Sequence, residues 1–515
     1  MQRLDKLLIT LLLVAIWFYR ILPSIQGHLI YSNDAWDLTR DIMRSMENIF
    51  RPFICSPETS CYYNYWPSPV IISHILGSVA GLDIMIIPII IVSASVILLS
   101  IASMTLVKNL LGKRIINAMI LLLLIWPPNL HYTAFKAETI ALPLEILVFA
   151  QLLNSLINER RTSLIALSLL AYGVVSTHHF TTYNMLWTST LYVFLIYVLN
   201  GFRTVNKFLI KSIATISIIS GLYFLVIREA KKPLNLEDLQ ILASYTVTLL
   251  LVATITNILS PEPPRKILDR LVLAASFASL IILNRVAHLL NAPQSESIGL
   301  LASGLSMAGL AITASRIINT RNNYGSAGER LFVAWIIPPL SLSIYALFDN
   351  YAFLIYRGFV ALSIPLIIAA APALSKEYLR RDRVLIIALL MILVSAIIVS
   401  PMIVLNKRDP YTGSLWIYSS GEVSDLEKIS FLINNTICTD TRIGPVLRFF
   451  IDNEVRDCSI NIARGSLPRN TSVIISMAIY PYVLLPSARL EYVEWNKLQG
   501  KDLVYNSDLV RVFMS

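Results

Sequence analysis

The chain has 515 residues, of which 56% are hydrophobic and only 14% are charged, and its formal net charge is +10. Soluble domains carry about 25% charged residues, so this composition excludes an ordinary soluble protein and indicates that lipid surrounds much of the chain. The basic residues form short clusters between apolar runs, a pattern that membrane topology explains and that does not indicate a nucleic-acid partner.

Apolar runs recur over the first four-fifths of the sequence, and a bilayer span needs about 20 such residues. The first run continues past Trp17 without a small-residue cleavage site, which favours a retained span over a signal peptide. The run at 68–82 is too short and interrupted to cross, and we expect a buried or interfacial helix there. About thirteen spans are predicted, near residues 5–24, 84–107, 115–128, 138–157, 163–177, 184–200, 208–227, 238–259, 268–288, 298–316, 331–348, 354–374 and 384–405.

Lysine and arginine are unevenly distributed among the loops that join these spans. If the N-terminus is cytoplasmic, every inside loop is basic, as at Lys113 and Arg114 or at Arg160 and Arg161. The outside loops contain almost no lysine or arginine, apart from the loop at 228–237. This asymmetry predicts a multi-pass protein of the cell membrane with a cytoplasmic N-terminus and an extracytoplasmic C-terminus.

The first outside loop, residues 25–66, is long and contains the acidic stretch SNDAWDLTRDIMRSM. Asp34, Asp37 and Asp41 recur at intervals of three and four residues, so on a helix they share one face. Asn33 is placed to cap that helix. The face is either a carboxylate cluster that lines a cavity or the solvated surface of a capped helix, and the sequence leaves both interpretations open.

Three further polar patches lie where the predicted spans reach the outside. Histidine at a helix end is usually structural, and an arginine inside a span usually snorkels or pairs with a nearby carboxylate. The functional alternative is a phosphate site, because guanidinium and imidazole donors suit phosphate oxygens. The residues concerned are His131, Lys136 and Glu138 in the first patch, His178 and His179 in the second, and Asp349 and Arg357 in the third.

From about residue 406 onward, polar and charged residues become frequent, which predicts a mixed α/β domain over 406–515 after a transmembrane domain over 1–405. Within it we expect an amphipathic helix at 425–434, a buried strand at 473–477 and a hairpin at 503–514 that turns at Asn506-Ser507.

All four cysteines fall on the expected outside of the membrane. An even number confined to one side predicts two disulfides in an oxidising space. Pairing within each outside segment gives Cys55–Cys61 and Cys438–Cys458. Reduced, buried thiols are the alternative.

Together these features resemble the GT-C superfamily of membrane glycosyltransferases, which use polyprenyl-phosphate-linked sugars. The resemblance implies an all-α polytopic membrane bundle of about thirteen transmembrane helices with a small C-terminal α/β extracytoplasmic domain. It is carried by the acidic loop with Asp34 and Asp37, the segment YNYWPSP with Trp66, the patch of Lys136 and Glu138, the segment YRGFVALSIPLIIAAAPAL at 356–374, which is similar to the late span of archaeal members, and the ending LVYNSDLVRVFM at 503–514.

The number of spans and the topology are also similar to those of the catalytic subunit of oligosaccharyltransferase. That family carries the motif WWDYG at the start of its outer domain, whereas the nearest text here is LWIYSSG at 415–421, which lacks the aspartate. We therefore expect transfer of a single sugar and not of a whole oligosaccharide to asparagine.

The resemblance implies an inverting enzyme that moves a sugar from a polyprenyl-phosphate donor, of which dolichol phosphate is one carrier, to a glycan, lipid or protein acceptor. It makes Asp34 the expected general base and Asp37 its partner. No cofactor is implied with certainty; a divalent metal, Mg²⁺ or Mn²⁺, would use these two aspartates, although their spacing differs from a DxD pair. The expected donor-phosphate ligands are His178, His179, Arg357 and Lys136, with Glu138, His131, Asp349 and Trp66 in support.

Two other functions remain open. A transporter or flippase for a lipid-linked sugar needs charged or broken segments near the middle of the membrane, for which Glu145 and Arg285 are the main candidates. A non-catalytic scaffold with an outer binding domain needs no carboxylate cluster. The enzyme is favoured because a carboxylate can deprotonate an acceptor hydroxyl while cations stabilise a departing phosphate.

Overall fold

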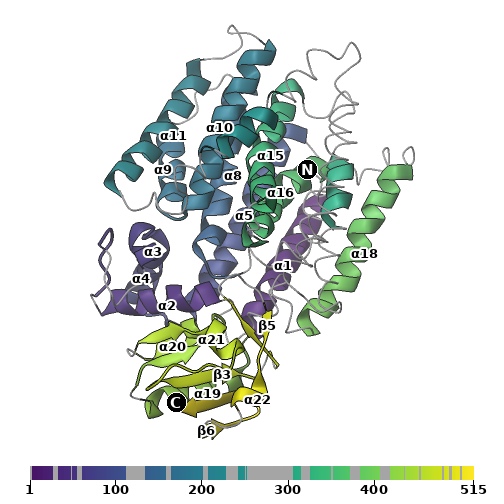
Figure 1. Cartoon of the computed structure of the whole chain (residues 1–515). Coiled ribbons are helices and arrows are strands. Elements are labelled where there is room, and N and C mark those ends of the chain that lie inside the picture. The colour runs from purple at the N-terminus through teal and green to yellow at the C-terminus, as the bar shows by residue number, and fades with distance from the viewer. Residues whose placement is uncertain are drawn as a thin grey trace.

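The computed structural model of the protein is mostly helical, with a small region of β-sheet near the C-terminus (Figure 1). It describes residues 3–26, 33–47, 49–54, 61–111, 134–157, 164–200, 207–227, 240, 242–249, 251, 306–314, 325–348, 352–371, 383–405, 418–433, 435–451, 454–477, 479, 481–485, 490–498 and 502–514.

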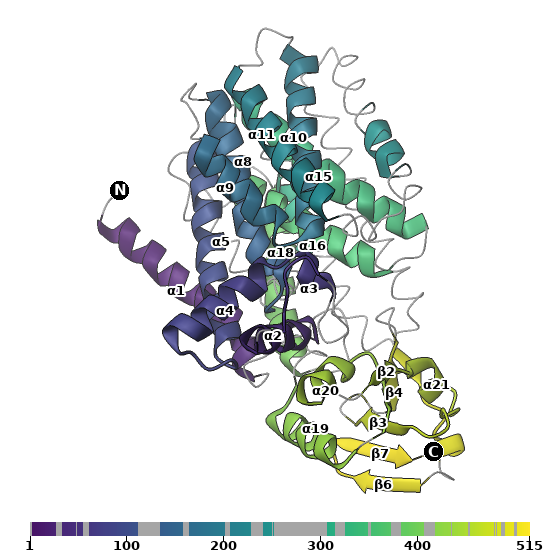
Figure 2. The ribbon, with the colours of Figure 1, turned by 90° about the vertical axis from the view of Figure 1, so that its left-hand side faces the viewer.

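Long apolar helices pack side by side into a bundle, and short helices of the first predicted loop lie at one end of it (Figure 1, Figure 2). Within the bundle α5 packs on α8, and α15 packs on both α10 and α16. The helices are α1 (Arg3–Gln26), α2 (Asn33–Met46), α3 (Cys61–Tyr65), α4 (Ser68–Ala80), α5 (Ile87–Leu111), α8 (Ala137–Ile157), α9 (Leu164–Val175), α10 (His179–Asn200), α11 (Lys207–Val226), α15 (Gly325–Phe348), α16 (Ala352–Ala370) and α18 (Arg383–Leu405).

Three helices in the described part of the chain are long and apolar enough to cross a membrane, at Ile87–Asn109, Ala137–Asn154 and Lys207–Val226. All three coincide with predicted spans, but the expected number of about thirteen is not confirmed. In the predicted span 163–177 the described helix α9 has 12 residues, fewer than the roughly 20 that a span needs. The predicted spans at 115–128 and 268–288 lie outside the described residues.

The segment expected to form a buried or interfacial helix is α4. Its 13 residues begin with a proline in the first turn and end at Gly81, which has a φ of 64° and forms a left-handed cap. Ile71, Ile75 and Val79 are exposed along one side of the helix, at the i, i+4, i+8 spacing of a single face. An apolar stripe along one side of a helix is typical of a helix that lies along a membrane surface.

The C-terminal α/β region, residues 418–514, has the mixed class that the sequence predicts. Its sheet has the strand order β2-β1-β3-β7-β6, in which β1 runs parallel to β2 and β3, and β7 is antiparallel to β3 and β6. The elements are α19 (Ser420–Leu432), β1 (Ile437–Thr439), α20 (Gly444–Phe450), β2 (Val455–Asp457), α21 (Ser459–Ala463), β3 (Ser472–Ser476), β4 (Tyr482–Leu484), β5 (Leu490–Tyr492), α22 (Trp495–Leu498), β6 (Asp502–Asn506) and β7 (Val510–Met514).

The predicted boundaries in this region need small corrections. The helix expected at 425–434 begins earlier, because the side chain of Ser419 accepts a hydrogen bond from the Glu422 backbone N–H and caps α19. The strand expected at 473–477 is β3, every residue of which is buried. The expected hairpin is formed by β6 and β7, and its turn is closed by a bond from the Ser507 N–H to the Val510 carbonyl.

The disulfide Cys438–Cys458 is present, with the two Cα atoms 5.4 Å apart. It ties β1 to the residue that follows β2, the outer strand at that edge of the sheet. The second predicted pair stays a prediction, because Cys55 and the side chain of Cys61 lie outside the described part of the chain.

Helix α2 lies between the bundle and the C-terminal α/β region in both views (Figure 1, Figure 2). It packs against α4 on one side and α20 on the other. Trp36 is fully buried at this junction, with its ring centroid 5.3 Å from that of Phe449, 6.0 Å from that of Phe450 and 6.1 Å from that of Tyr418. These contacts fix the orientation of α2, whose first turns carry Asp34 and Asp37.

Candidate active site

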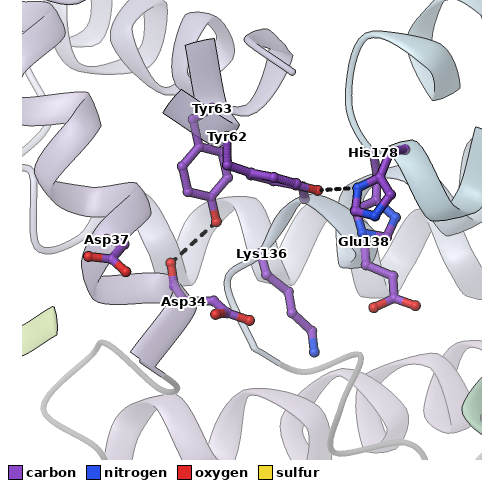
Figure 3. A pocket seen from close by; sticks show the side chains of 9 residues that line it. Asp34, Asp37, Tyr62, Tyr63, Lys136, Glu138 and His178 are labelled. Atoms are coloured by element: carbon purple, nitrogen blue, oxygen red, sulfur yellow. Dashed lines mark hydrogen bonds between the residues drawn. The ribbon is translucent and has the colours of Figure 1, made fainter. Parts of the chain in front are cut away.

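One cavity, with a volume of about 240 Å³, collects most of the side chains that the sequence singles out (Figure 3). Its walls come from four separate stretches of the chain: the start of α2, α3, the start of α8 and the start of α10. The described residues that line it are Asp34, Asp37, Tyr62, Tyr63, Lys136, Ala137, Glu138, His178 and His179.

The acidic wall consists of Asp34 and Asp37, which α2 presents from its first two turns (Figure 3). Asp37 accepts two hydrogen bonds from Arg448, at 3.3 Å from Nε and 3.2 Å from Nη2. Burial raises the pKa of the Asp37 carboxyl, and the charge of Arg448 opposes this effect. Asp41, expected on the same helix face, is buried and does not line the cavity.

An aromatic wall was missed by the sequence reasoning. The Tyr63 hydroxyl donates to the backbone carbonyl of Asp34 at 3.4 Å, and the Tyr62 hydroxyl lies 3.2 Å from Nδ1 of His179. Burial, followed by the negative charge of Asp34, raises the pKa of Tyr63 well above its ordinary value, so this phenol stays protonated. Both tyrosines belong to CYYNYW at 61–66, which overlaps the segment YNYWPSP at 63–69, and this cluster of aromatic residues is the signal that could have identified them.

Trp66 lies behind this wall and not in it. Its ring stacks on Tyr62, with centroids 5.0 Å apart and planes 28° apart, and its centroid lies 5.1 Å from that of His179. Its side chain is buried. The expected supporting role is therefore one of packing, because Trp66 holds the two residues that do face the cavity.

The opposite wall combines cationic and imidazole groups at two helix N-termini. Lys136 directly precedes α8, and Glu138 lies in its first turn; His178 precedes α10, which begins at His179. The Thr181 backbone N–H donates to Nδ1 of His178 at 3.3 Å, which makes Nδ1 an acceptor and places the proton of the neutral ring on Nε2. Helix N-termini favour anions through their unpaired N–H groups and the helix dipole, so this wall suits a phosphate.

The remaining predicted site residues are not seen in the cavity. His131 and Asp349 lie outside the described residues. Arg357 lies in α16, but its side chain is outside the described part of the chain. Glu145, the mid-membrane candidate, is buried inside the bundle and accepts a hydrogen bond from Asn184 Nδ2 at 2.6 Å.

The carboxylates at the cavity do not form a metal site by themselves. Within the described residues no group of three or more histidine, cysteine, aspartate or glutamate side chains is placed to hold a metal ion. Moreover, both oxygens of Asp37 are taken up by Arg448. The expected use of Asp34 and Asp37 as ligands for Mg²⁺ or Mn²⁺ does not fit this arrangement.

The fold of the chain is similar to that of a solved oligosaccharyltransferase. Two solved structures of the oligosaccharyltransferase of Archaeoglobus fulgidus show the likeness. The complex with Zn and sulfate matches with a TM-score of 0.55 and 13% identity over 95% of this chain and 73% of that one. The apo form matches with a TM-score of 0.51 and 12% identity over 95% of this chain and 75% of that one. No protein-family model and no curated protein matches the sequence. The fold and the apolar helices together indicate a membrane protein.

Proposed function

We propose that the protein is a membrane glycosyltransferase that moves a sugar from a polyprenyl-phosphate-linked donor to an acceptor on the extracytoplasmic side of the membrane. The observation that carries the proposal is a cavity with two carboxylates, Asp34 and Asp37, on one wall and a lysine, two histidines and Glu138 on the other (Figure 3). The likeness in fold to an oligosaccharyltransferase supports it.

The acidic wall supplies the base. In the proposed reaction Asp34 takes the proton from an acceptor hydroxyl, and the acceptor oxygen attacks the anomeric carbon of the donor sugar. The bond between that carbon and the phosphate oxygen breaks, and the polyprenyl phosphate leaves with the electron pair. A single displacement of this kind inverts the anomeric configuration. Asp34 is the better base of the two aspartates, because Asp37 is held in an ion pair by Arg448.

The opposite wall stabilises the leaving group. Negative charge grows on the departing phosphate in the transition state, where Lys136, the Nε2–H of His178 and the N-termini of α8 and α10 act on it. The hydroxyl of Tyr62 and the ring of His179, which contact each other, complete this wall. We also assign Arg357, near the beginning of α16, to the donor phosphate.

Transfer by the purified protein tests the proposal. The protein, reconstituted in lipid nanodiscs, is incubated with short polyprenyl phosphates that carry radiolabelled hexoses, together with glycan, lipid and peptide acceptors. We expect release of polyprenyl phosphate that depends on the acceptor. No release with any donor, release that does not depend on the acceptor, or movement of the intact donor across a vesicle membrane without transfer would overturn the proposal, and the last result would favour the transporter.

A matched pair of lysine variants tests the role of the phosphate wall. Lys136→Ala should lower the rate of transfer by about 10²–10³-fold, the usual cost of removing one group that stabilises a developing oxyanion. Lys428→Ala, on an exposed face of α19, should transfer at the rate of the wild type. Equal rates for the two variants would remove Lys136 from the site.

A further inference from the structure

In the described part of the chain, Arg448 of the C-terminal α/β region contacts the acidic wall of the cavity. Arg448, in α20, directs Nε and Nη2 at the two carboxylate oxygens of Asp37, in α2, although the two residues are 411 positions apart in the sequence. Two parallel N–H···O contacts of this kind form a bidentate pair, which fixes the orientation of the carboxylate as well as its charge. The pair lies next to the cavity, because Asp37 also lines it.

The surroundings of the pair distinguish it from an ordinary surface ion pair, which contributes little. Trp36 directly precedes Asp37, and Phe449 and Phe450 directly follow Arg448, so the aromatic contacts described above flank the ion pair along both chains. The two charged side chains are only 28% and 34% exposed. The aromatic packing therefore holds Asp37 and Arg448 in place, and the two side chains lose little further conformational entropy when the ion pair forms.

We propose that Arg448 is a positioning residue of the active site, through which the C-terminal α/β region completes the acidic wall of the cavity. This inference rests on the proposed function. Two carboxylates at one site share a proton unless a cation holds one of them ionised. By holding Asp37 ionised and turned toward α20, Arg448 leaves Asp34 as the carboxylate that accepts the proton from the acceptor.

The direction of the pH effect follows from the charges around Asp37. Burial raises the pKa of Asp37, the positive charge and hydrogen bonds of Arg448 lower it, and the charge of Asp34 raises it. Without Arg448 the pKa of Asp37 rises, so this carboxyl takes up a proton at a higher pH, and the acid limb of the rate profile moves upward. The charged and titratable groups that bear on Asp37 are Asp34, Arg40, Tyr63, Tyr418, Arg448 and, across the cavity, Lys136.

The experiment compares full-length variants in two measurements, the pH profile of sugar transfer and the midpoint of thermal unfolding. Arg448→Ala should lower transfer by about tenfold or more and move the acid limb of the rate profile to higher pH, because an arginine favours the ionised form of a neighbouring aspartate. Arg448→Lys should restore part of the rate, because it keeps the charge without the bidentate geometry. Arg456→Ala is the matched control, since Arg456 pairs with Glu454 on an exposed surface, and it should retain the wild-type profile.

If Arg448→Ala folds poorly, the double variant that combines it with Asp37→Asn still tests the inference. Asp37→Asn combined with Arg448→Ala should transfer no more slowly, and unfold at no lower temperature, than the worse of the two single variants. Additive losses, or an Arg448→Ala profile that superimposes on that of the wild type, would overturn the inference while the proposed function stands. If the wild type itself transfers no sugar, the proposed function fails, and the positioning role of Arg448 fails with it.

Discussion

Asp34 and Asp37 show how two identical side chains, one helical turn apart, acquire different environments. Asp34 lies in the first turn of α2, where the helix dipole favours a negative charge, and its backbone carbonyl accepts from Tyr63. Asp37 is turned toward α20 and bound by Arg448. Because their partners differ, we assign the role of base to Asp34 and the role of a fixed negative charge to Asp37.

A second group of buried charges lies within the C-terminal α/β region. The Arg442 guanidinium is almost fully buried and binds both carboxylate oxygens of Glu422 and the hydroxyl of Ser476. Its backbone carbonyl accepts from the Tyr418 hydroxyl at 2.6 Å. A buried arginine has to be paired in this way, because an isolated charge costs several kcal/mol. The network joins α19 to β3, and it also holds Tyr418, the first described residue of the region, in place.

Because of Asp440, which lies beside this network, we expect the stability of the C-terminal α/β region to depend on pH. Burial, opposed by backbone hydrogen bonds and by Arg442, raises the pKa of Asp440 to about 6. The folded state therefore binds this proton more tightly than the unfolded state does, so the stability of the region falls as pH rises from about 4 to about 6, by up to about 3 kcal/mol, and levels off above that range.

Hydrogen exchange of the β3 peptide in the full-length protein, corrected for the intrinsic effect of pH on the exchange rate, measures this change. Asp440→Asn should make protection of β3 independent of pH over the same range. Asp508→Asn, which alters an exposed aspartate in the β6–β7 turn, should leave the dependence intact. Protection that increases from pH 4 to pH 6 in the wild type would contradict the assignment.

At the scale of elements, local patterns predict more than long-range ones. The spacing of Asp34 and Asp37 predicts the helix α2, and the turn residues Asn506-Ser507 within the segment 503–514 predict the β6–β7 hairpin. Tyr62 and Tyr63 lie in an aromatic cluster that is visible in the sequence, but neither their spacing nor their type indicates which members of the cluster face the cavity and which only pack. The contact between Asp37 and Arg448 could not be predicted from the sequence, because the two residues are 411 positions apart. Only the packing of α2 on α20 brings the two side chains together.

The disulfide is expected to stabilise one edge of the sheet. Cys438–Cys458 closes a loop with a sequence separation of 20 residues, and a loop of this size contributes about 3 kcal/mol in the chain-entropy estimate. Replacing both cysteines by alanine should speed hydrogen exchange in β2, which pairs with β1 in the described sheet, more than in β3 or β7. Unchanged exchange in β2 of the double variant would show that the disulfide adds nothing there.

At the scale of the whole molecule, α2 is the joint between the helical bundle and the C-terminal α/β region. One continuous hydrophobic core runs from bundle residues such as Phe149 and Trp335 through Trp36 to Leu447 and Val510 in the sheet region. Such continuity makes relative motion of the two parts costly and keeps the acidic wall at a fixed place. The sequence predicts the two parts separately but not this shared core, because composition reveals each part and not the surface between them.

The orientation in the membrane remains a prediction from the distribution of lysine and arginine. Single cysteines introduced at residue 161 and residue 470, in chains without the native cysteines, should differ in labelling by an impermeant reagent added to right-side-out vesicles. We expect the probe at 470 to be labelled and the probe at 161 to be labelled only after the membrane is opened. Labelling at 161 in intact vesicles would contradict the topology and place the cavity on the opposite side of the membrane.

The most direct test of the account is the rate of sugar transfer by Asp34→Asn. This substitution keeps the size and the hydrogen-bonding capacity of the side chain but removes the base, so the rate should fall by about 10²–10⁴-fold while the thermal unfolding midpoint stays that of the wild type. Asp508→Asn, the exposed control, should transfer at the wild-type rate. Full activity of Asp34→Asn would assign the base to Asp37 instead, and full activity of the variant that combines Asp34→Asn with Asp37→Asn would contradict the glycosyltransferase mechanism.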